Sequence, residues 1–410
     1  IISNKIGSSN SSYYLGYFGI LATYQNTIDI SKNEIFGVWG SGSTKYGLYV
    51  SYSTNVTVSK NQVHDIVYTG TGGYGAIGMY FMLDASNPVV AIYNNFIYHI
   101  AADGWNTAEN PYGISLNGSF TSGVVVYFNS IYLTQDAAYG LNYSNSVFSA
   151  GVFVNSGVSG INFRNNIIRN SLGLRSGSSL TTYKGYAIYY AGGSTDPFGT
   201  INRNLYYVTN HSTNTVGYGN YADILTIADW RTYTSAEANS TYADPTFVST
   251  SDLHIQTTFY TGVAITGYDD DIDGEPRIVP HRGADEQTAV SSPTITGVTP
   301  NTLYYDKGKT LTITGTQLNS VTTVTYGGVS ASITSATATE LVVTVPPGNY
   351  TSNDLVVTNP AGSATNTGVA RQSRTTIPVK SSGAGVDDHT TIASALNGLY
   401  AWKGATAMVV

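Results

Sequence analysis

The first half of the chain repeats one short pattern of apolar and polar positions. An apolar residue, any residue and a second apolar residue precede two mostly polar positions, an asparagine, any residue and another apolar residue. Weaker copies surround Asn4 and Asn204, and the asparagines recur about every 28 to 38 residues, a spacing typical of solenoid proteins. The clear copies occupy Ile28–Ile35, Val56–Val63, Val90–Ile97, Val124–Ile131 and Ile161–Ile168.

Each copy predicts two short strands separated by a turn. Alternation places residues such as Ile28 and Ile30 on one face of the first strand, and Ile35 points to the same interior after the turn. We expect the asparagine to lie at the turn, because asparagine tolerates left-handed backbone geometry. We also expect its amide to hydrogen-bond to the asparagine of the neighbouring coil. The predicted ladder consists of Asn4, Asn33, Asn61, Asn95, Asn129, Asn166 and Asn204.

A second series of strand patterns accompanies the asparagine copies. Its members are joined to those copies by loops rich in glycine and serine, the longer of which include residues 103–111 and 171–183. Two strand clusters in every repeat predict a parallel β-helix, in which each strand pairs with the coils above and below it. The second series comprises Tyr46–Val50, Tyr112–Leu116, Gly151–Val154 and Tyr186–Tyr190.

Residues 1–288 resemble the right-handed parallel β-helix domains of the pectin-lyase-like class, which carry such an asparagine ladder. The end of this region resembles the closing segment of β-helix domains in large secreted bacterial surface proteins. Its motifs are Trp230, Asp244–Phe247, Asp252–Ile255, Asp271–Arg277 and Gly283–Glu286, in that order.

A second domain is predicted over residues 289–370, after the linker Ser291–Pro293. Short Thr- and Val-rich segments there alternate with turn signals about every ten residues, as in a small β-sandwich. The motifs resemble the immunoglobulin-like TIG (IPT) fold. The resemblance extends over about residues 292–370. We predict strands at Thr294–Val298, Thr310–Thr314, Thr322–Tyr326, Ala331–Thr334, Glu340–Val345 and Asp354–Thr358.

The last part of the chain, residues 371–410, changes character again. Apolar residues at helical spacing predict one amphipathic helix over Thr390–Tyr400, with Asp387 and Asp388 before it. After Gly404, residues 405–410 have the pattern of a strand. We interpret the helix and strand as the entry to a further β-helix domain. We also expect both ends of the chain to be cut from a longer polypeptide.

Composition narrows the classes of function. Only 10% of the 410 residues are charged and the net charge is −7, which excludes a basic nucleic-acid surface and a polybasic membrane patch. The chain has no cysteine, so disulfides, thiolate metal sites and thiol nucleophiles are excluded. No apolar run approaches the length needed to span a bilayer. The 34 tyrosines suit stacked, half-exposed strands, although sugar-stacking platforms remain an alternative.

Few residues of the sequence are candidates for catalysis or metal binding. Polysaccharide-active enzymes need paired carboxylates or a calcium-binding carboxylate cluster, and the best candidates are His64 with Asp65, and Asp103 with Glu109. We interpret these residues as turn and loop polars and predict no catalysis. No histidine pair has the spacing of a metal site such as H-E-x-x-H.

Asp269, Asp271 and Asp273 form the first half of a calcium loop. Pro280 occupies the position where a helix–loop–helix site requires glutamate, so we favour an acidic turn that closes the solenoid. Calcium held by the three carboxylates stays open as an alternative, and no other cofactor is expected.

The combination of a β-helix with an immunoglobulin-like domain resembles the giant adhesins of gliding bacteria that the type IX secretion system exports. This resemblance implies an extracellular, cell-surface rod that bears on a polysaccharide or substratum and joins neighbouring domains of the same polypeptide. It implies neither nucleic-acid binding nor membrane insertion of this segment. Two alternatives stay open: a polysaccharide lyase or hydrolase with an accessory domain, and a purely structural surface filament.

Overall fold

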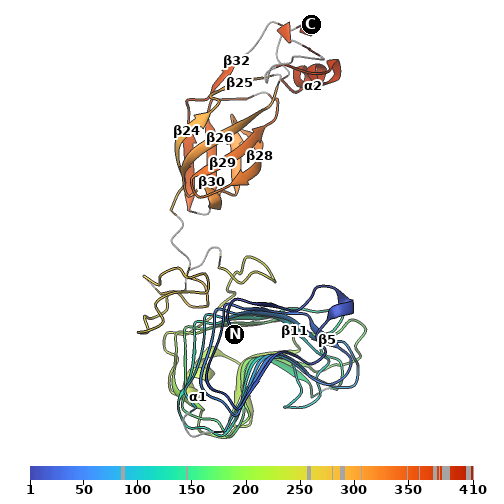
Figure 1. The fold of residues 1–410 in the computed structure, drawn as a ribbon, viewed down its shortest axis with the longest axis vertical. Helices are drawn as coiled ribbons and strands as arrows, with labels where there is room; N and C mark the ends of the chain where they lie inside the picture. Colours follow the sequence, from blue (N-terminus) through green and yellow to red (C-terminus); the bar gives the residue numbers. More distant parts are fainter. Residues whose placement is uncertain are drawn as a thin grey trace. The chain divides into compact units, whose positions relative to one another are not determined.

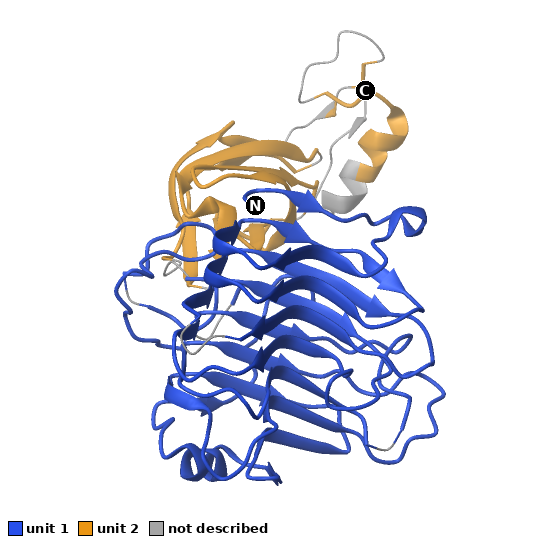
Figure 2. Cartoon of the chain, turned by 60° about the horizontal axis from the view of Figure 1, so that its bottom comes forward, with its two compact units in different colours: residues 1–287 blue, residues 288–410 orange. Residues whose placement is uncertain are grey.

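The computed structural model shows a mostly β protein that divides into two compact units, residues 1–287 and 288–410 (Figure 2). The figure draws the first unit in blue as layers of strands and the second in orange. The structure describes residues 1–84, 88–144, 146–255, 260–278, 280–286, 291–305, 307–348, 350–359, 361–372, 376–377, 379–380, 388–402 and 408–409.

The first unit consists of repeats that each place strands in three sheets. Along the chain, a strand of sheet A is followed by the ladder asparagine, then by sheet B and, after a loop, by sheet C. Viewed as in Figure 1, strands of successive repeats lie over one another. Sheet A contains β3 (Asn26–Ser31), β7 (Thr54–Ser59), β10 (Val90–Tyr93), β13 (Val124–Tyr127), β16 (Ile161–Arg164) and β19 (Phe198–Asn202).

Sheets B and C continue the same stacking. Every described strand pair in the three sheets is parallel, except that of the last two strands of sheet C. Sheet B contains β1 (Lys5–Ile6), β4 (Glu34–Ile35), β5 (Val38–Gly40), β8 (Gln62–Tyr68), β11 (Phe96–Ala101), β14 (Ser130–Leu133), β17 (Ile167–Asn170), β20 (Leu205–Val208) and β23 (Thr241–Tyr242). Sheet C contains β2 (Phe18–Thr23), β6 (Lys45–Ser51), β9 (Ala76–Leu83), β12 (Tyr112–Gly118), β15 (Phe148–Val154), β18 (Lys184–Tyr190), β21 (Thr213–Gly219) and β22 (Ala222–Ile224).

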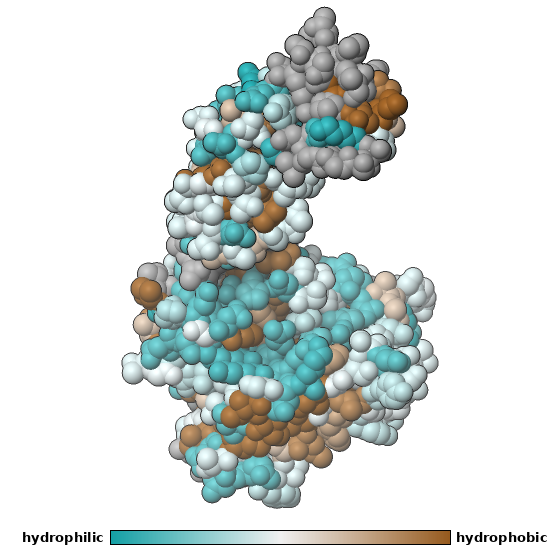
Figure 3. All heavy atoms as spheres, turned by 45° about the horizontal axis from the view of Figure 1, so that its top comes forward, coloured by the Kyte–Doolittle hydropathy of each residue, from teal (hydrophilic) through white to brown (hydrophobic). Residues whose placement is uncertain are grey.

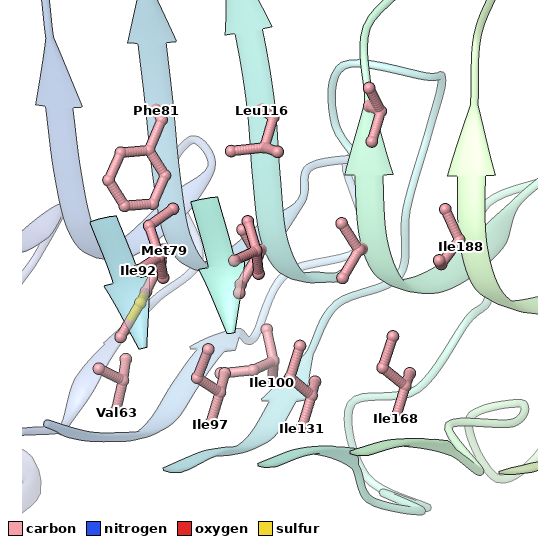
Figure 4. Close-up of a cluster of buried hydrophobic side chains, with 14 of the residues drawn as sticks. Val63, Met79, Phe81, Ile92, Ile97, Ile100, Leu116, Ile131, Ile168 and Ile188 are labelled. Atoms are coloured by element: carbon pink, nitrogen blue, oxygen red, sulfur yellow. The ribbon is translucent and has the colours of Figure 1, made fainter. Parts of the chain in front are cut away.

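The core of the first unit lies between the three sheets and runs through all the repeats. Figure 4 shows Val63, Ile97, Ile131 and Ile168 in a row, one from each successive strand of sheet B, and all four are fully buried. These are the apolar residues two positions after the ladder asparagines. The period-2 pattern of the sequence therefore becomes columns of similar β-branched side chains along the stack.

A column of glycines on sheet C faces these four side chains. A Cβ atom on Gly113 would lie 2.5 Å from Cγ2 of Ile131 and 2.6 Å from the carbonyl oxygen of Gly151. Gly47 and Gly78 have equally close neighbours. At this column sheets B and C are therefore too close together for sheet C to carry any residue larger than glycine.

The helix α1 (Ile227–Thr234) follows the last strand of sheet C. Thr226 begins it as an N-cap, since its hydroxyl accepts a 3.1 Å hydrogen bond from the backbone N–H of Asp229. Trp230 on this helix is fully buried and joins the core at the end of the stack. A 3₁₀ turn, η1 (Ser11–Tyr13), precedes β2.

The second unit has its own hydrophobic core and a seven-stranded, antiparallel arrangement. All six strands predicted for the second domain are present, and β25, β31 and β32 add to them. The strands are β24 (Thr294–Thr299), β25 (Thr302–Tyr304), β26 (Lys309–Thr316), β27 (Thr323–Tyr326), β28 (Val329–Ala336), β29 (Glu340–Val345), β30 (Leu355–Asn359), β31 (Gly362–Asn366) and β32 (Ala370–Gln372), with the 3₁₀ turn η2 (Leu318–Ser320).

The helix predicted over residues 390–400 is confirmed as α2 (Ile392–Trp402), shifted by two residues. Of the strand predicted beyond it, β34 (Met408–Val409) is described and pairs in parallel with β33 (Thr376–Ile377). Asp387 and residues 403–407 and 410, which also belong to this prediction, lie outside the described residues, as do residues 287–290 at the predicted domain boundary.

Candidate functional site

The seven predicted asparagines form one continuous hydrogen-bonded column. In each pair of neighbours, the backbone N–H and the side-chain Nδ2 of one asparagine both donate to the Oδ1 of the next, at 2.9 to 3.3 Å. Asn4 is exposed, whereas the other six are buried. Because each buried amide also donates to backbone carbonyls, the ladder satisfies polar groups that would otherwise be costly to bury.

The turn itself differs from the prediction. The left-handed residue is the one before each asparagine, with φ between 53° and 59°, and not the asparagine. Both donors of each asparagine face the same oxygen of the next repeat. The chain makes its left-handed turn at the residue before the asparagine. The residues with positive φ are Ser3, Lys32, Lys60, Asn94, Phe128, Asn165 and Arg203.

A buried glutamate ends the ladder. The backbone N–H of Asn204 donates to Ser240 Oγ at 2.8 Å, and its Nδ2 lies 3.4 Å from both carboxylate oxygens of Glu237. Trp230 Nε1 also donates to Glu237, at 3.3 Å, as do the hydroxyls of Ser240 and Tyr206. Burial raises the pKa of Glu237, and these donors oppose that shift. No sequence pattern singled out Glu237, because its partners come from three separate segments.

The closing segment, residues 260–278 and 280–286, lies along the turns that carry the ladder. Lys60 pairs with Asp270 at 2.5 Å, and Asn94 Nδ2 donates to the carbonyl of Asp270 at 2.6 Å. Further along the stack, Asn165 exchanges hydrogen bonds with the backbone of Val263, and Arg282 donates to the carbonyl of Asn204 at 3.0 Å. The segment therefore crosses five repeats.

Arg277 anchors the closing segment. Its guanidinium donates to Glu286 at 2.8 Å and to Asn94 Oδ1 at 3.0 Å, and it also reaches the carbonyls of Gly283 and Ala284. The side chains of Arg277 and Glu286 are only 1% and 4% exposed. Such a buried pair is stable only because hydrogen bonds satisfy its remaining donors.

Two of the three carboxylates of the predicted calcium loop, Asp271 and Asp273, have separate partners. Asp271 is fully buried and accepts hydrogen bonds from the backbone N–H groups of Asp273, Glu275 and Glu286 at 2.7 to 3.0 Å. Asp273 instead pairs with His254, at 2.9 Å. Among the described residues, Asp269, Asp271 and Asp273 do not converge within 4.8 Å. The acidic turn thus organises its own backbone.

A row of charged residues crosses sheet B over successive repeats. His64 lies 2.9 Å from Asp65 and 3.4 Å from Glu34. His99 is bonded through Nδ1 to Asp65 and through Nε2 to Asp136, the latter at 2.9 Å. Sequence reasoning paired His64 with Asp65 and missed the other partners. The signal was present, since Asp65 and His99 each follow a ladder asparagine by four residues.

The histidine and the two carboxylates at the centre of this row, His99, Asp65 and Asp136, stabilise one another's charged forms. Burial lowers the pKa of His99, but the hydrogen bonds to Asp136 and Asp65 outweigh it and raise the pKa to about 9. Burial raises the pKa values of Asp65 and Asp136, but their histidine partners hold both below the ordinary range. The imidazolium of His99 is therefore bridged by two carboxylates at neutral pH.

A cavity of about 300 Å³ opens beside this row. Tyr98 and Thr134 line it together with His64, Asp65 and His99. The Oγ1 atom of Thr134 is buried and has no hydrogen-bond partner. The cavity could thus accept a small polar ligand.

The second predicted pair, Asp103 and Glu109, binds different groups. Asp103 is fully buried and accepts hydrogen bonds from the backbone N–H groups of Gly73 and Tyr74 at 3.1 and 3.2 Å. Glu109 accepts a long hydrogen bond of 3.5 Å from Thr44 Oγ1. Burial raises the pKa of both carboxyl groups. Asp103 acts on the backbone of a neighbouring loop and does not form a carboxylate pair.

Aromatic rings cover the outer face of sheet C, apart from the main core. Tyr49 and Tyr80 stack with centroids 4.6 Å apart, and Tyr189 and Tyr218 stack at 4.3 Å. These residues occupy equivalent positions of neighbouring strands. Close to this face, Tyr24 and Tyr52 stack at 5.0 Å and are 76% and 48% exposed.

Comparisons with known proteins bear on the second unit. A search of curated proteins found no match to the chain. Among the described residues, none of the helices is both long and apolar enough to cross a bilayer. Residues 293–372 match the IPT/TIG domain family. The second unit therefore contains an immunoglobulin-like IPT/TIG domain, as its strand pattern and motifs predicted.

Proposed function

We propose that residues 1–288 form a right-handed parallel β-helix of the pectin-lyase-like class and act as a rigid rod. The chain would be a non-catalytic segment of a giant extracellular adhesin, of the kind that type IX secretion exports to the surface of gliding bacteria. The IPT/TIG domain spaces or presents the rod. The observation that carries this proposal is the unbroken asparagine ladder, since one hydrogen-bonded column links all seven repeats.

Adhesion needs a contact surface as well as stiffness. The stacked rings near sheet C present flat apolar faces with hydroxyl edges, which suit the faces and hydroxyls of a polysaccharide. Many weak contacts of this kind along a rod yield useful avidity. The partner in this proposal is an extracellular polysaccharide or a substratum, with neither nucleic acid nor a membrane involved.

The test is binding of the whole chain to a panel of immobilised bacterial and plant polysaccharides. We expect retention on at least one of them and weaker retention of the Tyr24→Ser/Tyr52→Ser variant. Tyr13→Ser is the matched control, because Tyr13 is 72% exposed but lies in η1, outside the stacked pair. Absence of binding to every polysaccharide and to bare surfaces would instead favour a purely structural filament.

A polysaccharide lyase or hydrolase is the second candidate function, favoured by the cavity beside His99. The bridged state of His99 supports the non-catalytic proposal, because both ring nitrogens are bonded to carboxylates whose pKa values are lowered. Release of reducing or unsaturated sugars from the same panel, lost in Asp65→Asn, would establish the enzyme and overturn the adhesin.

A further inference from the structure

Three side chains converge where the closing segment meets sheet B. His254, Asp273 and Asp285 each offer one ligand atom, and these atoms all lie within 4.8 Å of one another. The three residues come from separate parts of the chain, around 254, 273 and 285. Among the described residues, this is the only group of three histidine or carboxylate side chains whose ligand atoms lie so close together.

The imidazole of His254 is held in a defined orientation. Its Nδ1 is bonded to the carboxylate of Asp252, and its Nε2 lies 2.9 Å from Oδ2 of Asp273. The ring also meets Phe96 edge to face, with centroids 5.0 Å apart. A carboxylate on one ring nitrogen is the usual outer contact of a metal-binding histidine, because it fixes the tautomer and directs the other nitrogen to the metal.

Asp285 shares the cation His254 with Asp252 and Asp273. It is only 8% exposed and accepts one long hydrogen bond, 3.4 Å, from the backbone N–H of Ile255. Burial raises the pKa of Asp285 to about 6; the charge of His254 opposes this shift, and the nearby carboxylates of Asp271 and Asp273 add to it. The neighbouring guanidinium of Arg277 is committed to Glu286. The pocket thus gathers more negative charge than its described cations balance.

We propose that His254 Nε2 and the carboxylates of Asp273 and Asp285 bind one divalent transition-metal ion, with Zn²⁺ as the best match. One nitrogen and two carboxylate oxygens leave a fourth position for water in a tetrahedral shell. The histidine argues against calcium and magnesium, which prefer oxygen ligands throughout. Asp252 is then a positioning residue.

Bound metal would join the hydrogen-bonded pair of His254 and Asp273 to Asp285, at the end of the closing segment. The proposal neither needs nor implies the adhesive function, since His254 packs on Phe96 of sheet B whereas the stacked tyrosines belong to sheet C. It also differs from the predicted calcium loop, because Asp271 serves backbone N–H groups and Asp285 takes part instead.

Isothermal titration of the chelator-treated chain with ZnCl₂ tests the site. We expect one ion per chain and proton release, because the ion displaces the proton that Nε2 donates to Asp273. Asp252→Asn should weaken binding about 10- to 100-fold, and His254→Gln or Asp285→Asn at least as much. Histidine-ring NMR of the unaltered chain should show the Zn²⁺-induced shift at Nε2 of His254, so the result does not depend on a variant folding.

His99→Gln is the matched control. His99 also lies between two carboxylates, but no third ligand converges on it within 4.8 Å among the described residues. Its loss should leave the Zn²⁺ affinity unchanged. Absence of binding at millimolar Zn²⁺, or binding that His254→Gln leaves intact, would overturn the proposal. Calcium binding that is lost in Asp269→Asn would assign the metal to the acidic turn instead.

Discussion

At the scale of single residues, the first unit depends on small side chains whose neighbours lie one repeat away. Each internal ladder asparagine bonds to groups in two other repeats, and each glycine of the sheet C column admits a β-branched side chain of sheet B. Defects at these positions are therefore expected to spread along the stack.

Asn95→Ala should destabilise the first unit strongly. It leaves the N–H and Nδ2 of Asn61 without their acceptor and removes the donor to the carbonyl of Val58, all of them buried. Each buried group that loses its partner costs roughly 1–3 kcal/mol, so we expect a loss of about 3 kcal/mol or more. Chemical denaturation measures it. Asn4→Ala, at the exposed end of the ladder, is the control and should cost far less.

Gly113→Ala tests the glycine column. The new methyl group would lie 2.5 Å from Ile131 and 2.6 Å from the carbonyl of Gly151, so the two sheets must separate. Overpacking of this kind costs about 1–3 kcal/mol or more, measured as a lower free energy of unfolding. Gly42→Ala is the control, because nothing lies within 4 Å of its Cβ position. Equal stabilities of the two variants would contradict the close approach.

At the scale of elements, sheet B aligns titratable groups that are distant in sequence. Tyr98 pairs with His64 in the register of β8 and β11, which brings His99 beside Asp65. Sequence could predict this alignment only by counting from the ladder asparagines. Asp136 could not be found that way, because it lies in the loop after its strand, where repeat lengths vary.

The row at His99 predicts a stability change in mild alkali. The pKa of His99 in the folded chain is about 9, above its ordinary value of 6.5, so its stabilisation is complete below pH 6.5 and is lost as the pH rises through 9. The slope should not exceed about 1.4 kcal/mol per pH unit. His99→Gln should flatten the decline in unfolding free energy between pH 6.5 and 9. His254, also near 9, contributes equally to both proteins, so only their difference reports His99.

Asp65 and Asp136 act at the opposite end of the pH scale. Their pKa values in the folded chain are lowered, so their contribution is present above the ordinary carboxyl range and is lost as the pH falls through the folded values. The contribution of this row to stability should therefore be constant between the acid range and pH 6.5. A difference in unfolding free energy between the unaltered chain and His99→Gln that does not fall from pH 6.5 to 9 would contradict the ionic bridge.

At the scale of the whole molecule, the two units have separate hydrophobic cores. We expect the full chain to unfold in two transitions, one for each unit. We expect residues 291–372 to fold alone and to unfold cooperatively at the temperature at which the second unit unfolds in the full chain. Scanning calorimetry of both proteins measures this. A second unit that remains unfolded by itself would show that its core is insufficient.

Few residues of the chain are charged, and the surface of the molecule indicates which groups meet water instead. Figure 3 shows a broad hydrophilic area on the first unit with a hydrophobic patch below it. Many charges pair within the closing segment and along sheet B. Water therefore meets amides and hydroxyls more than free charges.

Much of the architecture could be predicted because it is periodic. The ladder asparagines, the apolar columns and the IPT/TIG strands repeat a local pattern that a single sequence displays. The buried cap at Glu237 and the convergence of His254, Asp273 and Asp285 could not, because each depends on where the chain returns after many residues. Close approach at Gly113 depends likewise on the spacing of two sheets.

The closing segment changes how mechanical load would pass through the first unit. Arg277 and Ala284 attach beside Asn94 and Ser130, in the middle of the stack. A pull applied beyond Glu286 would therefore enter at these central repeats through the buried Arg277–Glu286 pair. The bonds of Arg282 to Asn204 and Thr241 would carry part of the load to the last repeats. The force needed to open the unit would then depend on the Arg277–Glu286 pair and on the bonds of Arg282 together.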